Sequence, residues 1–253
     1  MGNLLFPIAR ALAGERERGG VFVYPTMRQV KIGPILRGEI DKRTYGDVLR
    51  PRTAADWRIW AASHLAKSVD EHAAPGAAYG DHRVVYEGLG RYFLPIAEHA
   101  QLMRDWLGAN ARLSAQLTQP YDIAVHVRLA DFIDDDGSHD GFNIRQSWGW
   151  YRSALNEARI RSGKDNPSIR LFADVPATAI LPEIGAESAV VDASGNALTA
   201  MMNLSRAAIV VTSRSTFSMW GTFLGECTSI WNGRMNVAEY YPVTPGRDIF
   251  VHA

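Results

Sequence analysis

The residue type best suited to bind an anion in this sequence is the arginine that follows the apolar run YDIAVHV, residues 121–127. Four of the five residues from Ile123 to Val127 are apolar, so the run predicts a buried strand that ends just before Arg128. A guanidinium at that position offers a planar fork of donors to a diphosphate. His126 lies inside the apolar run, and we expect its side chain to point into the fold and hydrogen-bond to the backbone. An ordinary surface ion pair is the competing interpretation of Arg128.

A second candidate anion site follows the apolar run AAIVV, residues 207–211. Five polar residues form the expected turn and a helix is predicted to begin there, with Phe217 among its packing residues. Serine and threonine are favoured at a helix N-cap, where the free N–H groups and the helix dipole attract phosphate. Capping without any ligand is the competing interpretation. The turn residues are Thr212, Ser213, Arg214, Ser215 and Thr216.

An acidic stretch lies shortly after Arg128 and comprises Asp131, Asp134, Asp135, Asp136 and Asp140. One of these carboxylates, placed near an acceptor hydroxyl, could act as a general base. Asp134 and Asp136 also form an Asp-x-Asp pair that could hold a divalent cation beside a nucleotide diphosphate. A solvated acidic loop is the competing interpretation. Neither a GxGxxG motif nor a Walker loop is present, so an ordinary dehydrogenase or P-loop kinase has no support.

The second half of the chain predicts a parallel α/β sheet. Strands are expected at YDIAVHV, SIRLFA, SAVV and AAIVV, and helices at about residues 147–161, 196–204 and 216–225. Short β-rich runs that alternate with helices indicate parallel strands joined by crossover helices. Ligands of such sheets bind beyond the carboxyl ends of the strands, where both candidate anion sites are expected to lie.

The first half is less regular. Apolar spacing predicts helices over residues 3–14, 54–68 and about 95–117, and short strands at VFVYP and RVVYEG. Trp57, Trp60, Ala61 and Leu65 form the expected apolar face of the second helix, and residues 26–53 are expected to be a long surface connection with short elements. We place the boundary between an N-terminal lobe, residues 1–118, and a C-terminal lobe, residues 119–253.

The composition excludes several classes of protein. The chain has 253 residues, 47% of them hydrophobic, which is ordinary for a globular protein and long enough for one large α/β unit or two small lobes. Lysine plus arginine equals aspartate plus glutamate at 27 each, so no overall basic field would hold nucleic acid. Cys227 is the single cysteine, so no intrachain disulfide can form. No apolar run reaches membrane-span length and the N-terminus lacks a signal-peptide pattern, so we expect a cytoplasmic protein without a transmembrane segment.

Four segments, in order, resemble the bacterial alpha-1,2-fucosyltransferase family and, more loosely, the alpha-1,6- and protein O-fucosyltransferases. GNLLFPIARALA is similar to an opening Gly-Asn-x-x-Phe helix, and EGLGRYFLPIAEHAQLMRDWL to the segment before the donor lobe. HVRLADF is similar to the signature His-x-Arg-Arg-x-Asp, and VVTSRSTFSMWGTFLGE to an Asn-Ser-Ser-Phe-Ser-x-Trp block. Two departures stand out: Leu129 replaces the second signature arginine, and Ser213-Arg214-Ser215 replaces Asn-Ser-Ser. Arg214 could supply the missing cation.

The resemblance implies an α/β, two-lobed GT-B-like glycosyltransferase whose Rossmann-like C-terminal half is the donor lobe. It implies an inverting transfer of fucose from GDP-fucose to a glycan acceptor, with no metal and no further cofactor. Arg128 corresponds to the signature arginine that contacts the donor diphosphate, and Asp131 or Asp136 is the candidate base. The residues assigned to donor binding are His126, Arg128, Ser213, Arg214, Ser215, Thr216, Phe217, Asp174 and Asn3.

Two other interpretations stay open. Asp134 and Asp136 could serve a metal-dependent glycosyltransferase that uses another nucleotide sugar. Leu129 is compatible with a protein that binds a nucleotide sugar without turning it over.

Overall fold

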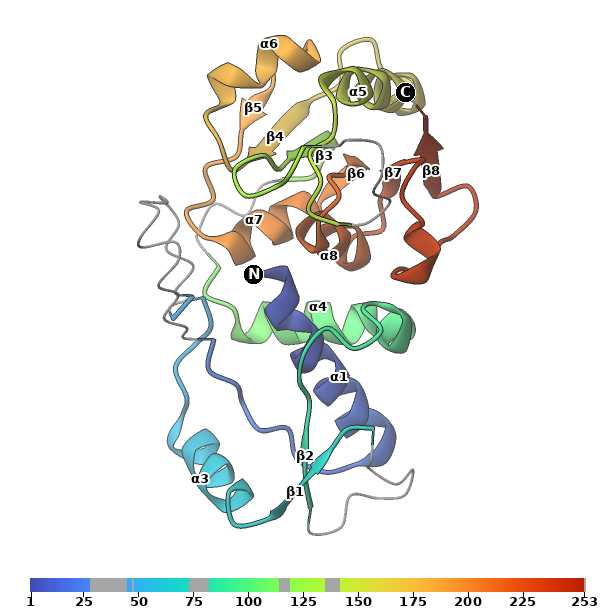
Figure 1. The fold of residues 1–253 in the computed structure, drawn as a ribbon. Coiled ribbons are helices and arrows are strands. Elements are labelled where there is room, and N and C mark those ends of the chain that lie inside the picture. The colour runs from blue at the N-terminus through green and yellow to red at the C-terminus, as the bar shows by residue number, and fades with distance from the viewer. Residues whose placement is uncertain (28–44, 47, 73–81, 114–118, 135–141, 253) are drawn as a thin grey trace. The chain divides into compact units, whose positions relative to one another are not determined.

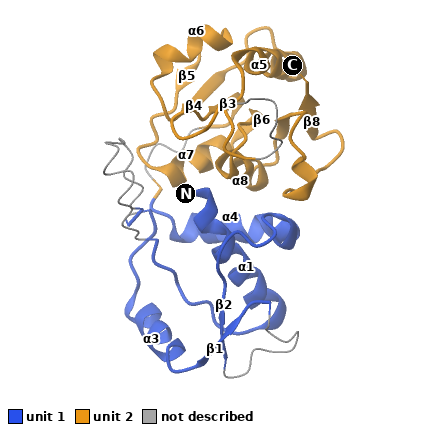
Figure 2. Cartoon of the chain, in the orientation of Figure 1, with its two compact units in different colours: residues 1–112 blue, residues 113–253 orange. Residues whose placement is uncertain are grey.

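The structure is a computed structural model of the 253-residue chain that describes residues 1–27, 45–46, 48–72, 82–113, 119–134 and 142–252. The chain divides into two compact units, Met1–Arg112 (unit 1) and Leu113–Ala253 (unit 2), coloured separately in Figure 2. The expected lobe boundary, between residues 118 and 119, falls at the end of the undescribed stretch 114–118.

Unit 2 contains a six-stranded parallel sheet in the order β5-β4-β3-β6-β7-β8 (Figure 1). Chain order runs one way from β3 to β5 and the other way from β6 to β8, as in a Rossmann-like doubly wound fold. The four expected strands are present, whereas β7 and β8 were not predicted. The strands are β3 (Tyr121–Val127), β4 (Ile169–Ala173), β5 (Val190–Val191), β6 (Ala207–Val211), β7 (Thr228–Asn232) and β8 (Asp248–Val251).

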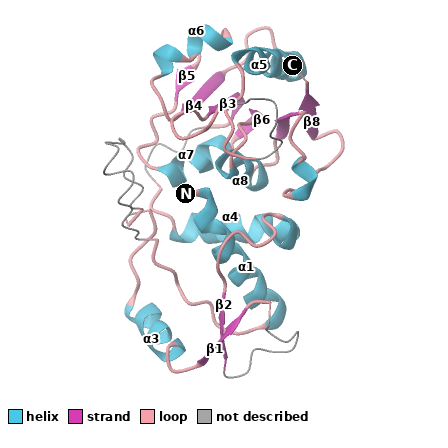
Figure 3. Ribbon diagram, viewed as in Figure 1, coloured by secondary structure: helices cyan, strands magenta, loops and turns pink. Residues whose placement is uncertain are grey.

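The helices of unit 2 alternate with its strands, as Figure 3 shows. The three predicted helices correspond to α5 (Trp148–Ser162), α7 (Ala197–Leu204) and α8 (Thr216–Leu224). Each begins at a polar side chain that accepts a backbone N–H bond: Ser147, Asn196 and Ser215. Three shorter helical segments were not predicted: η2 (Ala177–Ala179), α6 (Leu181–Ile184) and η3 (Val237–Glu239).

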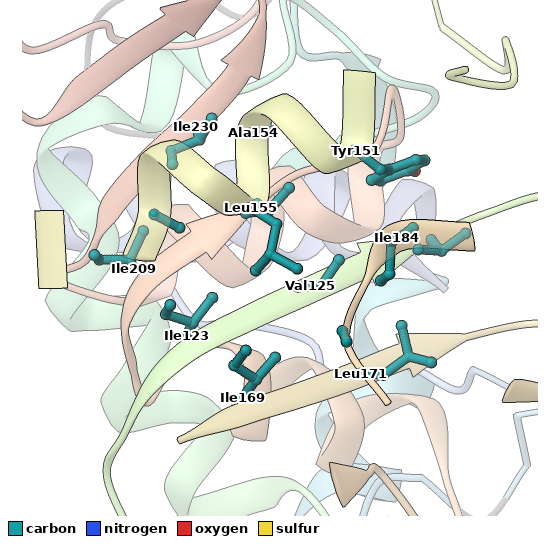
Figure 4. Close-up of a cluster of buried hydrophobic side chains, with 14 of the residues drawn as sticks. Ile123, Val125, Tyr151, Ala154, Leu155, Ile169, Leu171, Ile184, Ile209 and Ile230 are labelled. Carbon is teal, nitrogen blue, oxygen red and sulfur yellow. The ribbon is translucent and has the colours of Figure 1, made fainter. Parts of the chain in front are cut away.

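Successive side chains of β3 point to opposite faces of the sheet. Ile123, Val125 and Val127 belong to a buried cluster that α5 covers through Tyr151, Ala154 and Leu155 (Figure 4). Ala124 belongs to a second cluster, which includes Leu204 of α7 and has Phe217 of α8 packed against it. His126 has the same parity as Ala124, so its side chain points toward the α7/α8 face.

Unit 1 is built on the helices α1 (Gly2–Arg18) and α4 (Ala100–Asn110), which pack against each other. The aromatic ring of Phe6 packs edge-on against the rings of Tyr92 and Phe93, with centroids 5.6 and 4.8 Å away. The other elements of this unit are α3 (Ala54–Ser63), β1 (Lys67–Asp70), β2 (His82–Val85) and η1 (Leu94–His99). The strands β1 and β2 pair in parallel, and β2 corresponds to the expected strand RVVYEG.

Several predictions for this half were wrong in detail. The run VFVYP forms no strand, and the backbone N–H of Phe22 donates instead to the carboxylate of Glu15. The helix expected over residues 54–68 ends at Ser63, because Lys67–Asp70 pairs as β1 with β2. The helix expected to residue 117 ends at Asn110, because Ala111 forms an antiparallel bridge with Leu49. In the last two cases a partner distant in sequence replaces the local preference.

The region predicted as a surface connection, residues 26–53, lies largely outside the described residues. Among the helices that the structure describes, none has the length and apolarity of a membrane span.

Candidate functional site

The point where strand order reverses, between β3 and β6, is where ligands of doubly wound sheets bind. Arg128 follows the last residue of β3 at this point. Its Nε lies 2.9 Å from Asp131 Oδ1 and 3.0 Å from Asp174 Oδ2. The Arg128 side chain is 27% exposed, and its guanidinium carbon lies 5.8 Å from the centroid of the Phe132 ring. Arg128 thus forms a partly exposed ion pair at the carboxyl edge of the sheet, with two carboxylates around one cation.

Asp174 organises the loop that follows β3. It comes directly after β4, the neighbour of β3 in the sheet. Its two carboxylate oxygens accept the backbone N–H groups of Leu129 and Ala130, at 2.9 and 3.0 Å. With Arg128 as its third partner, this carboxylate is occupied within the protein, so its role here is to fix the Arg128 loop.

His126 joins β3 to the turn after β6. Its Nδ1 lies 2.7 Å from Ser213 Oγ, and its ring stacks on Phe217 with centroids 4.9 Å apart. The side chain points into the fold as expected, but its partner is a serine hydroxyl rather than the backbone. Burial, and secondarily the charge of Arg128, lower the pKa of His126 to about 3. The imidazole is therefore neutral at physiological pH and cannot serve there as a charged partner for phosphate.

The turn after β6 is a network of buried hydroxyl groups. Ser213 Oγ lies 2.8 Å from Ser215 Oγ, and Ser218 Oγ donates to the carbonyl of Ser213 at 2.9 Å. Ser215 is the N-cap of α8 and accepts the backbone N–H of Ser218. Thr216 is the first residue of α8 and is half-buried. The network holds the helix N-terminus next to His126.

Arg214, the residue that could add a cation for the donor, is buried. Its side chain is only 1% exposed, which makes it one of the largest fully buried side chains. Its backbone carbonyl accepts the N–H of Asn143 at 3.0 Å. In this structure the guanidinium belongs to the interior of unit 2, whereas the Arg128 side chain is partly exposed.

The acidic stretch is described only in part. Asp134 is largely exposed and pairs with Arg145 at 2.9 Å, whereas Asp135, Asp136 and Asp140 lie outside the described residues. No group of three or more potential metal ligands occurs in the part of the chain that the structure describes.

Two residues near the site were missed from the sequence. Arg145 donates to the carbonyl of Leu129 at 2.8 Å, and the buried amide of Gln146 donates to the carbonyl of Thr212 at 3.2 Å. These bonds connect the segment before α5 with the two candidate loops. Their only signal in the sequence was the position just before the Ser147 cap. Asn3 is exposed on the first turn of α1 in unit 1.

The geometry brings together Arg128, Asp131, Asp174, His126, Ser213, Ser215 and Phe217 around the carboxyl ends of β4, β3 and β6. Comparison of the chain with protein-family models, with curated proteins and with solved structures finds no match.

Proposed function

We propose that this protein is an inverting glycosyltransferase that binds a nucleotide-sugar donor, GDP-fucose, on unit 2. One observation carries the proposal. Contacts between residues far apart in sequence, Arg128 with Asp174 and His126 with Ser213, bring four of the expected donor-binding residues to the switch point of a Rossmann-like sheet. Nucleotides bind at this position in doubly wound folds. A two-lobed GT-B arrangement belongs to this proposal.

Departure of the diphosphate builds negative charge that fixed donors can stabilise. In the proposed reaction the guanidinium of Arg128 and the N–H groups at the N-terminus of α8 stabilise this negative charge. The hydroxyl network around Ser213 and Ser215 keeps the N-terminus of α8 in place before the donor arrives. Loss of a single such donor in other enzymes costs about 3 to 4 kcal/mol in the barrier.

The ion pair of Arg128 with Asp131 suggests how the base becomes available. A carboxylate paired with a guanidinium is a weak proton acceptor, because the positive charge stabilises its ionised form. When Arg128 turns to the donor diphosphate, Asp131 is released to take the proton of an acceptor hydroxyl. Donor binding and base activation are then coupled in one exchange.

A thermal-shift titration tests the donor assignment. GDP should stabilise the protein, by about 2.7 kcal/mol at 100 times its dissociation constant, and UDP should do so less. Arg128→Ala should remove most of this stabilisation and abolish transfer. Arg128→Lys should rescue poorly, since an ammonium keeps the charge without the planar fork. Arg206→Ala is the matched control, because Arg206 is an exposed arginine of unit 2 outside the site.

Equal stabilisation by GDP and UDP, or by UDP alone, would argue against fucose as the sugar. Normal transfer by Arg128→Ala would overturn the donor site itself. If the protein binds GDP-fucose but neither transfers nor hydrolyses the sugar, it is an inactive nucleotide-sugar-binding protein. The ion pairs of Arg128 with Asp131 and Asp174 favour this second candidate, because the two carboxylates already neutralise the guanidinium.

A further inference from the structure

Unit 1 contains a cavity of about 800 Å³ that the proposed donor site does not use. Its walls come from α1, residues 19–25, α3 and β2, all of which are labelled or traceable in Figure 1. Apolar side chains dominate the lining and include Ile8, Phe22, Trp60 and Val84. This volume lies within the range of small-molecule sites, which are mostly apolar with a few polar groups.

The helix α3 faces this cavity without being buried by the protein. It has two tryptophans and an isoleucine in ten residues, yet none of its residues is buried and Trp57 is 50% exposed. Ile59 and Trp60 of this helix line the cavity. A helix of this length has little stability by itself and normally depends on packing of its apolar face. An apolar ligand in the cavity would supply that packing.

Two arginines give the cavity its charge preference. Arg52 donates its Nε to the carbonyl of Tyr24 at 2.9 Å, and its guanidinium lies over the rings of Trp57 and Trp60, 4.8 and 5.4 Å from their centroids. Its Nη groups donate to no side chain or carbonyl of the described residues. Burial lowers the pKa of Arg52, but a guanidinium remains charged at neutral pH. This cation therefore has donors to offer to a ligand.

Arg83 is the second cation in the lining. It donates through Nη2 to Ser68 Oγ at 2.6 Å, while its buried Nε has no hydrogen-bond partner within the described part of the chain. The one carboxylate among the described lining residues is Glu15, which already accepts the N–H of Phe22 at 2.9 Å. Two arginines against one carboxylate leave the cavity with an excess of positive charge.

We propose that this cavity binds a small amphipathic anion. The apolar body lies against α1 and Trp60, and a carboxylate or phosphate head pairs with Arg52, with Arg83 adding to the positive field. The site belongs to unit 1 alone and does not depend on the proposed sugar transfer.

Calorimetric titration of the full chain with decanoate, below its micelle concentration, tests the proposal. Decanoate should bind at least about tenfold more tightly than 1-decanol or decyltrimethylammonium, since a charge-assisted bond adds to the same apolar contact. Decyl phosphate distinguishes a phosphate head from a carboxylate head. Across octanoate, decanoate and dodecanoate, each further buried methylene should tighten binding about fourfold, the equivalent of about 0.8 kcal/mol.

Variants localise the binding. Arg52→Gln should weaken decanoate at least about tenfold and leave 1-decanol unchanged, whereas Trp60→Ala should weaken both. Arg58→Gln is the matched control, because Arg58 is exposed on the same helix and does not line the cavity. If Arg52→Gln unfolds unit 1, Arg83→Gln provides the same comparison.

Three results would overturn the proposal: no binding of any decyl probe, equal affinity for decanoate and 1-decanol, or an Arg58→Gln defect as large as that of Arg52→Gln. GDP titration of the same variants reports on unit 2, so failure here is distinguishable from failure of the donor site.

Discussion

Replacement of His126 tests the buried connection between β3 and the turn after β6 through the pH dependence of stability. The imidazole is 5% exposed, lies 2.7 Å from Ser213 Oγ and stacks on Phe217. Burial, and then the neighbouring charge of Arg128, lower its pKa from 6.5 to about 3. The native protein therefore keeps His126 neutral under conditions in which an unfolded chain would protonate it.

The sign and size of the effect follow from this difference in proton binding. Stability is fully present above the unfolded pKa of 6.5 and is lost as pH falls toward 3, because only the unfolded state takes up the proton in that interval. Each pH unit within the interval changes the free energy of unfolding by about 1.4 kcal/mol. The loss attributable to His126 reaches about 2 kcal/mol at pH 5, a large part of the roughly 5 to 15 kcal/mol typical of folded proteins.

Urea unfolding at about pH 7.5 and about pH 5 measures this loss. Asparagine is the replacement to use, because its side chain can still hydrogen-bond to Ser213 but does not titrate. His126→Asn should lose about 2 kcal/mol less than the wild type between the two pH values. Any destabilisation of the variant that is independent of pH cancels in this difference. His72→Asn, at an exposed histidine, is the matched control and should behave like the wild type.

Equal pH-dependent losses in the wild type and His126→Asn would refute the reasoning. They would mean that His126 takes up its proton in the folded state, so that the interior next to Ser213 admits water or a counter-ion.

Three further predictions concern the proposed donor site and the packing of α8 against α7. Asp131→Asn should tighten GDP binding about 1.4- to fivefold, because a partly exposed ion pair of about 0.2 to 1 kcal/mol no longer competes for Arg128. The same variant should lose transfer with the base, and weaker GDP binding would contradict this prediction. Activity should survive EDTA, and its loss with recovery in manganese would favour the metal-dependent alternative. Gly221→Ala should destabilise the protein by about 1 to 3 kcal/mol in thermal unfolding, since a Cβ there would lie 2.8 Å from Leu204 Cγ of α7, whereas Gly108→Ala in open space should not.

The strand and helix pattern of unit 2 could be predicted because the local sequence and the tertiary structure agree there. Residues 123–127 of β3 are buried on both faces of the sheet, so this stretch is apolar except for His126. The helices α5, α7 and α8 carry their own caps at Ser147, Asn196 and Ser215. The strands β7 and β8 carried a weaker signal, because short apolar runs such as those around Trp231 and Phe250 also fit other structures.

Unit 1 shows where local reasoning fails. Trp57 and Leu65 were expected on the apolar face of one helix, yet Trp57 is half exposed and Leu65, which lies beyond the end of α3, is 91% exposed. Periodicity identifies an apolar face but not what covers it. The ends of α3 and α4 were set by pairing with residues elsewhere in the chain, which helix propensity cannot anticipate.

The sequence by itself determined that Arg128 follows a buried strand and that a capped helix begins after Ser215. Only the tertiary structure decided which groups surround them, because partners 45 to 87 positions apart meet through the sheet and not through the chain. In the tertiary structure Arg128 forms an ion pair with Asp174, His126 is hydrogen-bonded to Ser213, and Arg214 is buried. The type and spacing of residues define which chemistry is possible, whereas strand order and burial decide which side chains can reach one another.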